Sequence, residues 1–272
     1  MKNILIPTDF SKNADLALDY AIHTFPEPET RFWLVHVYRM PYSGAVISID
    51  LDDLLMKERE EEIEKQLQAA RVNHPNVDIK ARALQGVFLD VITRIIKTDH
   101  MDVVVMGTTG ATGAKGVFLG SNAANMVKHS SVPVLLIPQL SELRPLKTIL
   151  LATDLKHVQS YETMRPIHTI AKQSGAVLEI LYLEDLDNVP VDEERETLLL
   201  DTVFADLPHN FHIQPLLQPE MDIMDFAEEV EADLVIAVAR NYGFFERLIH
   251  RSTTRKLSMI TDRPLLVLME PV

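Results

Sequence analysis

The chain of 272 residues contains no cysteine. This excludes a disulfide framework, a thiolate metal site and a thiol nucleophile, and it fits a reducing compartment. The N-terminus runs from Met1 almost directly into Ile4–Ile6, without the apolar stretch of ~7–15 residues and the small-residue cleavage site of a secretory signal. No apolar run approaches the ~20 residues that a membrane-spanning helix needs. We therefore expect a soluble, cytoplasmic protein with no membrane partner.

Positive charge is also scarce, because 26 Lys and Arg residues stand against 40 Asp and Glu residues, a formal net charge of −14. Nucleic acids and anionic membranes both reward clustered basic side chains, so neither is expected as a partner. A polyanionic ligand would have to be held by local backbone amides and helix dipoles. The ten histidines include no HExxH motif, so no dedicated metal site is expected.

What the chain does contain is an internal repeat. Three segments of the first half return in the second, at offsets of 145 and then 131 residues: Lys2–Asp9 as Lys147–Asp154, Asp102–Val105 as Asp233–Ile236, and Pro133–Ile137 as Pro264–Leu268. The repeat predicts two domains, residues 1–140 and 147–272. A short polar linker within Gln139–Leu146 separates them.

In the first copy, short apolar or β-branched runs alternate with helical patterns. The predicted strands are Ile4–Thr8, Phe32–Tyr38, Val77–Leu84, Val103–Met106 and Val134–Ile137. The predicted helices follow Ser11 or span Leu54–Ala70, Val87–Ile96 and Ser121–Lys128. This alternation predicts an α/β fold with a doubly wound parallel sheet in each domain, Rossmann-like or flavodoxin-like with five strands in the order 3-2-1-4-5. That order places the carboxyl ends of the first and fourth strands side by side, where ligands bind in such sheets.

Glycine is rare in the chain, yet five of the nine glycines fall within the fourteen residues Gly107–Gly120. They lie between a predicted strand and a predicted helix. Because glycine has no side chain, the backbone of this loop can approach a ligand closely. Ser121 and Asn122 follow as candidate helix N-cap groups, and the first helical turn supplies N–H groups for an anion. The spacing is neither G-x-G-x-x-G nor a Walker A loop. It is G-x2-G-x9-G-S, formed by Gly107, Gly110, Gly120 and Ser121.

Together with Ile4–Ser11, Leu34–Val37 and Val132–Pro138, this motif resembles the universal stress protein family. The resemblance covers essentially all of residues 1–138 and, more weakly, residues 147–272. It implies an ATP-binding protein of stress response or signalling whose domains pair through their last strands as a pseudo-dimer. Further homodimerisation is compatible with the sequence but is not fixed by it.

The resemblance also implies roles for individual residues. Asp9 and Val37 would hold the adenosine, with Pro7 and Thr8 nearby. Met106, Gly107 and Gly110 would take the ribose and phosphates, and Gly120, Ser121 and Asn122 would take the outer phosphates. Mg²⁺ would arrive with the nucleotide. The alternative for Asp9 is that it is merely a turn residue. His36, at the end of the second predicted strand, is expected to be a hydrogen-bonded structural histidine.

The second copy departs from the glycine pattern. At an offset of 131, the residues in place of Gly107, Gly110, Gly116 and Gly120 are Val238, Asn241, Arg247 and Arg251, while Ser252 is retained. We therefore expect the second domain not to bind ATP in the family's way. Arg247, Arg251 and Arg255 are spaced by four and are expected on one helix face. There they would contact acidic surface of the partner domain or bind an anion.

Two other kinds of function compete with nucleotide occupancy. One is an interaction scaffold without nucleotide, against which the intact first glycine loop argues. The other is an enzyme, either a slow ATPase or a relative of adenylyltransferases and pyrophosphatases. The latter need an H-x-G-H or S-G-G-x-D-S signature, which is absent. No general base or activated nucleophile is evident near the loop, so any hydrolysis is expected to be slow.

Overall fold

The structure of the protein is a computed structural model that describes residues 1–39, 49–109, 119–153, 161–184, 193–215, 217–239 and 263–269. The strands are β1 Asn3–Thr8, β2 Arg31–Tyr38, β3 Asp78–Gln85, β4 Val103–Gly107, β5 Val134–Ile137, β6 Thr148–Thr153, β7 Val177–Glu184, β8 His209–Pro215, β9 Leu234–Ala239 and β10 Leu265–Met269. The helices are α1 Lys12–Thr24, α2 Ile49–Asn73, α3 Phe88–Thr98, α4 Ser121–His129, α5 Tyr161–Ser174, α6 Glu193–Val203 and α7 Pro219–Glu229. Within these described ranges, no helix combines the length and apolarity needed to cross a bilayer.

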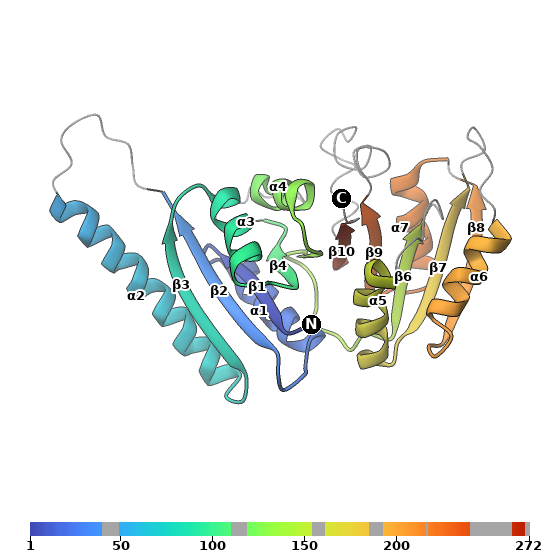
Figure 1. The fold of residues 1–272 in the computed structure, drawn as a ribbon, viewed down its shortest axis with the longest axis horizontal. Coiled ribbons are helices and arrows are strands. Elements are labelled where there is room, and N and C mark those ends of the chain that lie inside the picture. Colours follow the sequence, from blue (N-terminus) through green and yellow to red (C-terminus); the bar gives the residue numbers. More distant parts are fainter. Residues whose placement is uncertain are drawn as a thin grey trace.

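The strands form one sheet in the order β3-β2-β1-β4-β5-β10-β9-β6-β7-β8 (Figure 1). Each half therefore has the predicted order 3-2-1-4-5, and within each half neighbouring strands run parallel. The halves meet where β5 and β10 pair antiparallel, with Leu135 opposite Leu266. The predicted α/β fold class is confirmed, and this pairing joins the two predicted five-stranded sheets into one.

The strands are buried on both faces, which explains why several of them are apolar without alternation. In β4, Val103 and Val105 enter one apolar cluster, whereas Val104 and Met106 enter the other. Helices α1, α2, α5 and α6 contribute to the first cluster, and α3, α4 and α7 contribute to the second. Both clusters include residues of both halves. The core is thus shared across the junction between the halves.

The aspartate that recurs in the repeat has the same structural role in both halves. Asp102 Oδ2 accepts hydrogen bonds from the backbone N–H groups of Lys2 and Asn3, at 2.6 and 3.0 Å. Asp233 Oδ2 accepts the equivalent pair at the start of β6, at 2.8 and 3.1 Å. Each aspartate thereby joins the start of the fourth strand of its half to the start of the first. Its repetition is explained by the fold and needs no ligand.

The segment between the halves is fastened to α1 through Tyr20. This side chain is buried, and its hydroxyl donates a hydrogen bond to the carbonyl oxygen of Glu142. Burial raises the pKa of Tyr20 above its ordinary value, because the phenolate would lose its hydration.

Replacing Tyr20 by Phe removes this hydrogen bond and is expected to lower the free energy of unfolding by about 0.5–1.5 kcal/mol at pH 7. Because the folded-state pKa is raised, the contribution of the phenol is fully present below the unfolded pKa of about 10. It is lost as the pH rises through the folded value. Urea unfolding between pH 7 and about 10.5 should therefore show the difference between wild type and Tyr20→Phe shrinking at the alkaline end. A difference that stays constant over this range contradicts a buried, hydrogen-bonded phenol.

Candidate functional site

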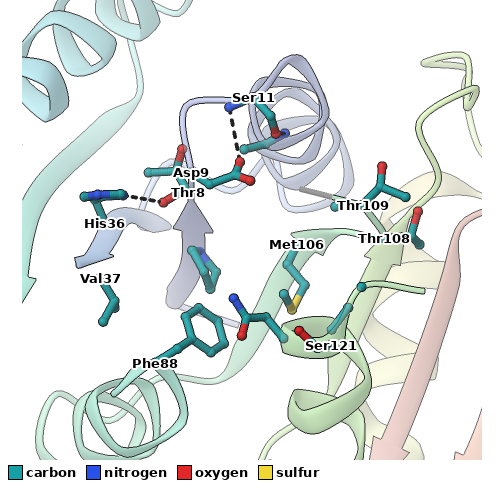
Figure 2. A pocket seen from close by; sticks show the side chains of 16 residues that line it. Thr8, Asp9, Ser11, His36, Val37, Phe88, Met106, Thr108, Thr109 and Ser121 are labelled. Carbon is teal, nitrogen blue, oxygen red and sulfur yellow. Dashed lines mark hydrogen bonds between the residues drawn. The ribbon is translucent and has the colours of Figure 1, made fainter. Parts of the chain in front are cut away.

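The carboxyl ends of β1 and β4 open into a cleft that the end of β2 and the starts of α3 and α4 complete (Figure 2). This is the edge of the sheet at which parallel α/β folds bind ligands. The empty space of the cleft is about 790 Å³, counting its open side.

The structure brings nine of the ten predicted site residues around this one cleft. These lining residues are Pro7, Thr8, Asp9, Val37, Met106, Gly107, Gly120, Ser121 and Asn122. The tenth, Gly110, lies outside the described residues, as does the predicted arginine face at Arg247, Arg251 and Arg255. The placement agrees with the predicted geometry, while the binding of nucleotide by these residues stays a prediction.

The turn from β1 to α1 is built from side chain to backbone hydrogen bonds. Thr8 Oγ1 accepts the N–H of Phe10 at 3.0 Å, and Asp9 Oδ1 accepts the N–H of Ser11 at 3.1 Å. Phe10 has a φ of 63°, a left-handed conformation that is uncommon for a residue other than glycine. Asp9 is thus both a turn residue and an exposed carboxylate on the cleft wall. The Thr8 hydroxyl is committed to the fold, because it also donates to Gln66 at 3.0 Å.

His36, beside this turn, lies at the end of β2 and has a clear structural contact. Its Nδ1 lies 2.9 Å from the carbonyl oxygen of Thr8. A carbonyl oxygen accepts hydrogen bonds and cannot donate them, so Nδ1 carries the proton. The ring also packs on Phe10, with centroids 4.4 Å apart. The prediction of a hydrogen-bonded histidine is confirmed, and the same ring lines the cleft.

One end of the cleft is apolar and includes Phe88, which sequence reasoning missed. Phe88 is the first residue of α3 and follows the N-cap Val87. Figure 2 shows Phe88 and Val37 at one side of the cleft, away from Thr108 and Thr109. An aromatic ring and a branched aliphatic side chain suit a flat, largely apolar ligand group.

The opposite end is formed by the N-terminus of α4. Its N-cap is Gly120, which contributes no side-chain hydrogen bond, and no acidic residue lies in the first turn. The N–H groups of such a turn, together with the helix dipole, favour an anion. The interpretation of Ser121 as an N-cap was wrong. The N–H of Gly120 donates to the carbonyl oxygen of Thr108 at 2.6 Å, which holds Gly120 outside the helix and makes Ser121 its first helical residue.

Asn13 is a second residue that sequence reasoning missed. It lies in the first turn of α1, is 3% exposed, and its Nδ2 donates to the carbonyl oxygen of Thr109 at 3.1 Å. The amide fills the space beside Gly107, where an added Cβ would lie 2.4 Å from Asn13 Nδ2. Gly107 is therefore required by its packing against α1. The glycine spacing predicted a ligand contact at this position but did not reveal the packing requirement. The contact between Asn13 and Gly107 could not be predicted from the spacing of residues in the sequence, because α1 and β4 meet through tertiary packing.

The described lining residues include no Lys or Arg. Their titratable side chains are Asp9 and His36. Over the described part of the chain, no group of three His, Asp or Glu side chains could hold a metal ion. An anion in this cleft would depend on backbone N–H groups, hydroxyls and the dipole of α4.

Comparison with known proteins finds relatives of one kind. The family model described as the universal stress protein family matches residues 1–138. Universal stress protein MJ0531 of Methanocaldococcus jannaschii is 32% identical over 139 residues, which are 50% of this chain and 81% of that protein. Universal stress protein MJ0577 of the same organism is 26% identical over 152 residues, which cover 50% of this chain and 94% of that protein.

Similarity to solved structures extends over the whole chain. A universal stress protein from Archaeoglobus fulgidus superposes with a TM-score of 0.73, covering 98% of both chains at 18% identity. At that identity the likeness concerns the fold, and it includes the C-terminal half that the family model does not match.

Proposed function

The chain belongs to the universal stress protein family, and we propose that its N-terminal half binds ATP and acts in stress response or signalling through nucleotide occupancy. The observation that carries this proposal is one cleft with two chemically different ends. Val37 and Phe88 form the apolar end, and the α4 N-terminus, without a capping side chain, forms the other. A nucleotide has the same division between a flat base and a polyanionic chain.

In this arrangement the base lies at the apolar end, with Asp9 on the turn beside the adenosine. The phosphates extend along Gly107 toward Gly120 and the first turn of α4. Backbone N–H groups there bind phosphate without any basic side chain. This is how a protein with a net charge of −14 can hold a polyanion.

Mg²⁺ would accompany the nucleotide and neutralise part of the phosphate charge. The hydroxyl of Ser121, which lines the cleft at the start of α4, would offer such an ion an oxygen ligand, since Mg²⁺ prefers oxygen ligands and keeps several waters. Fast phosphoryl transfer also needs a positioned base and further cations. Because the described lining residues supply no Lys or Arg, we infer that any ATP turnover is far below the ~10 per second of a median enzyme.

The C-terminal half is proposed to act as a permanent structural partner. It supplies β10, which covers the edge of β5 that an isolated N-terminal half would expose. The domain limits 1–140 and 147–272 and the cytoplasmic location stay predictions. A homodimer of the whole chain is an open alternative.

The test is the nucleotide content of the purified chain. Mass spectrometry of released ligand and calorimetric titration of the stripped protein are expected to give one ATP per chain. Ser121→Ala should weaken binding about tenfold, the usual cost of losing a hydrogen bond to a charged group. Ser131→Ala, an exposed position away from the cleft, should leave it unchanged. A stripped protein that binds no ATP would favour the interaction scaffold instead.

A further inference from the structure

Asn13 places a polar amide on the buried face of α1, where most of the other side chains are apolar. The side chain is 3% exposed, and burying an amide costs free energy unless it is hydrogen-bonded. Among the described residues, its Oδ1 has no hydrogen-bond partner, although this oxygen is buried. An apolar side chain would therefore suit the packing of α1 better, and the amide needs another explanation.

The other end of the amide contacts the candidate site. Asn13 Nδ2 donates to the carbonyl oxygen of Thr109 at 3.1 Å and lies 3.3 Å from its Oγ1. Because a carbonyl oxygen only accepts hydrogen bonds, the atom that faces it is the amide nitrogen, which fixes the orientation of the side chain. Thr109 lies two residues beyond the end of β4 and lines the cleft on the side opposite His36 and Val37 (Figure 2). Asn13 thus ties the first turn of α1 to the chain as it leaves β4.

The residue before Thr109 is held by backbone hydrogen bonds. The N–H of Thr108 donates to the carbonyl oxygen of Ile137 at 2.9 Å, and its carbonyl oxygen accepts the N–H of Gly120 at 2.6 Å. Thr108 is therefore fixed to the end of β5 and to the N-cap of α4. Asn13 extends this anchoring by one residue, so that three elements hold the point at which the chain leaves the sheet.

We propose that Asn13 is a positioning residue of the nucleotide site, which holds Thr109 so that the backbone from Gly107 to Thr109 is already placed for the phosphates. The inference rests on the proposed function. A ligand that meets a preformed backbone loses less free energy to ordering, so this preorganisation raises its affinity. Asn13 acts without touching the nucleotide, because its amide packs against Gly107 and does not line the cleft.

The test compares two variants of α1 that each lose hydrogen bonds of a buried side chain. Asn13→Ala removes both contacts with Thr109 and is expected to weaken ATP binding by the stripped full-length chain about tenfold in calorimetric titration. Tyr20→Phe, the matched control, loses its bond to Glu142 away from the cleft and should leave ATP affinity unchanged. Hydrogen exchange of the ligand-free proteins should be faster in the peptide that contains Thr108 and Thr109 in Asn13→Ala, and unchanged there in Tyr20→Phe.

Asn13→Asp provides a pH profile that a loss of packing would not produce, because the substitution keeps the shape of the side chain. At pH 8 a carboxylate cannot donate to the carbonyl of Thr109, and ATP binding should be about tenfold weaker than in wild type. Burial raises the pKa of the introduced carboxyl, because the ionised form loses its hydration. As the pH falls through that pKa, the acid regains an O–H donor, and the loss should shrink to about threefold at pH 5.5. Wild type measured at the same pH corrects for any titration of Asp9 and His36 in the cleft.

Three results would overturn this inference alone. The first is wild-type ATP affinity in folded Asn13→Ala. The second is a loss of affinity without faster exchange at Thr108 and Thr109, and the third is a loss in Asn13→Asp that does not change with pH. A wild-type chain that binds no ATP is a different outcome, because it contradicts the proposed function itself and this inference with it.

Discussion

Gly107→Ala is expected to lower the melting temperature by about 3–10 °C and to weaken ATP binding at least about tenfold. The added Cβ would lie 2.4 Å from Nδ2 and 2.7 Å from Cγ of Asn13, and the buried amide cannot retreat without losing its hydrogen bonds to Thr109. Overpacking of this kind costs ~1–3 kcal/mol. In a chain of this size each kcal/mol is worth roughly 2–4 °C. Differential scanning fluorimetry and calorimetric titration measure the two effects.

The control is a double-mutant cycle with Asn13→Ala. Removing the amide empties the space that the new methyl group needs, so the double variant should be more stable than the sum of the single effects by about 1 kcal/mol or more. The double-mutant cycle is measured as a free energy of unfolding, so it can be interpreted even if the chain binds no nucleotide. Additive effects would mean that Gly107 is required for some reason other than Asn13.

The C-terminal half supports this reasoning, because the residue equivalent to Gly107 there is Val238, near the end of β9. A parallel strand in this position therefore accepts a β-branched side chain. In sequence, the residue 145 positions after Asn13 is Val158, which carries no amide.

Gly120→Arg, which copies Arg251 of the second half, is expected to abolish ATP binding while leaving the fold intact. Gly120 has a φ of −60°, so any residue can adopt its backbone conformation. A Cβ there would lie 3.2 Å from the carbonyl oxygen of Thr108, a contact that small shifts can relieve. The remainder of the arginine side chain would occupy the space in front of the first turn of α4, where the phosphates are proposed to lie.

Gly120→Ala separates the two effects, since it adds the Cβ without the long side chain. It should retain ATP binding within about tenfold of wild type. Equilibrium titration with circular dichroism as a folding control measures both variants. Stoichiometric, tight ATP binding by Gly120→Arg would remove the glycine motif from the binding site.

In the first half, the sequence predicted every strand end within one residue, because a strand that is buried on both faces has a dense apolar run such as Val103–Met106. Helix α2 extends beyond its predicted span of Leu54–Ala70 to Ile49–Asn73. Its buried stripe at Ile63, Leu67 and Ala70 lies in the C-terminal part of the helix, whereas Leu54 and Met56, near the predicted start, are exposed. Burial therefore defines an element's core better than its ends.

The candidate site was predictable where residues follow strand ends, since topology alone brings Asp9, Val37 and Met106 to one edge of the sheet. The contact of Asn13 with Thr109 and the approach of Phe88 to the cleft were not predictable, because they depend on how α1 and α3 pack. The N-cap at Gly120 was missed for a similar reason. The hydrogen bond that fixes it comes from Thr108, a contact between the two ends of a loop.

The antiparallel pairing of β5 with β10 has a consequence for how the protein responds to its concentration in the cell. Two separate subunits paired through such strands would dissociate on dilution by mass action, and the exposed edges would change with expression level. Here the partner strand is part of the same polypeptide, so pairing depends on the effective concentration set by the linker and not on the number of molecules. The fraction of the proposed ATP sites that is occupied would then depend on the ATP concentration and not on the concentration of the protein.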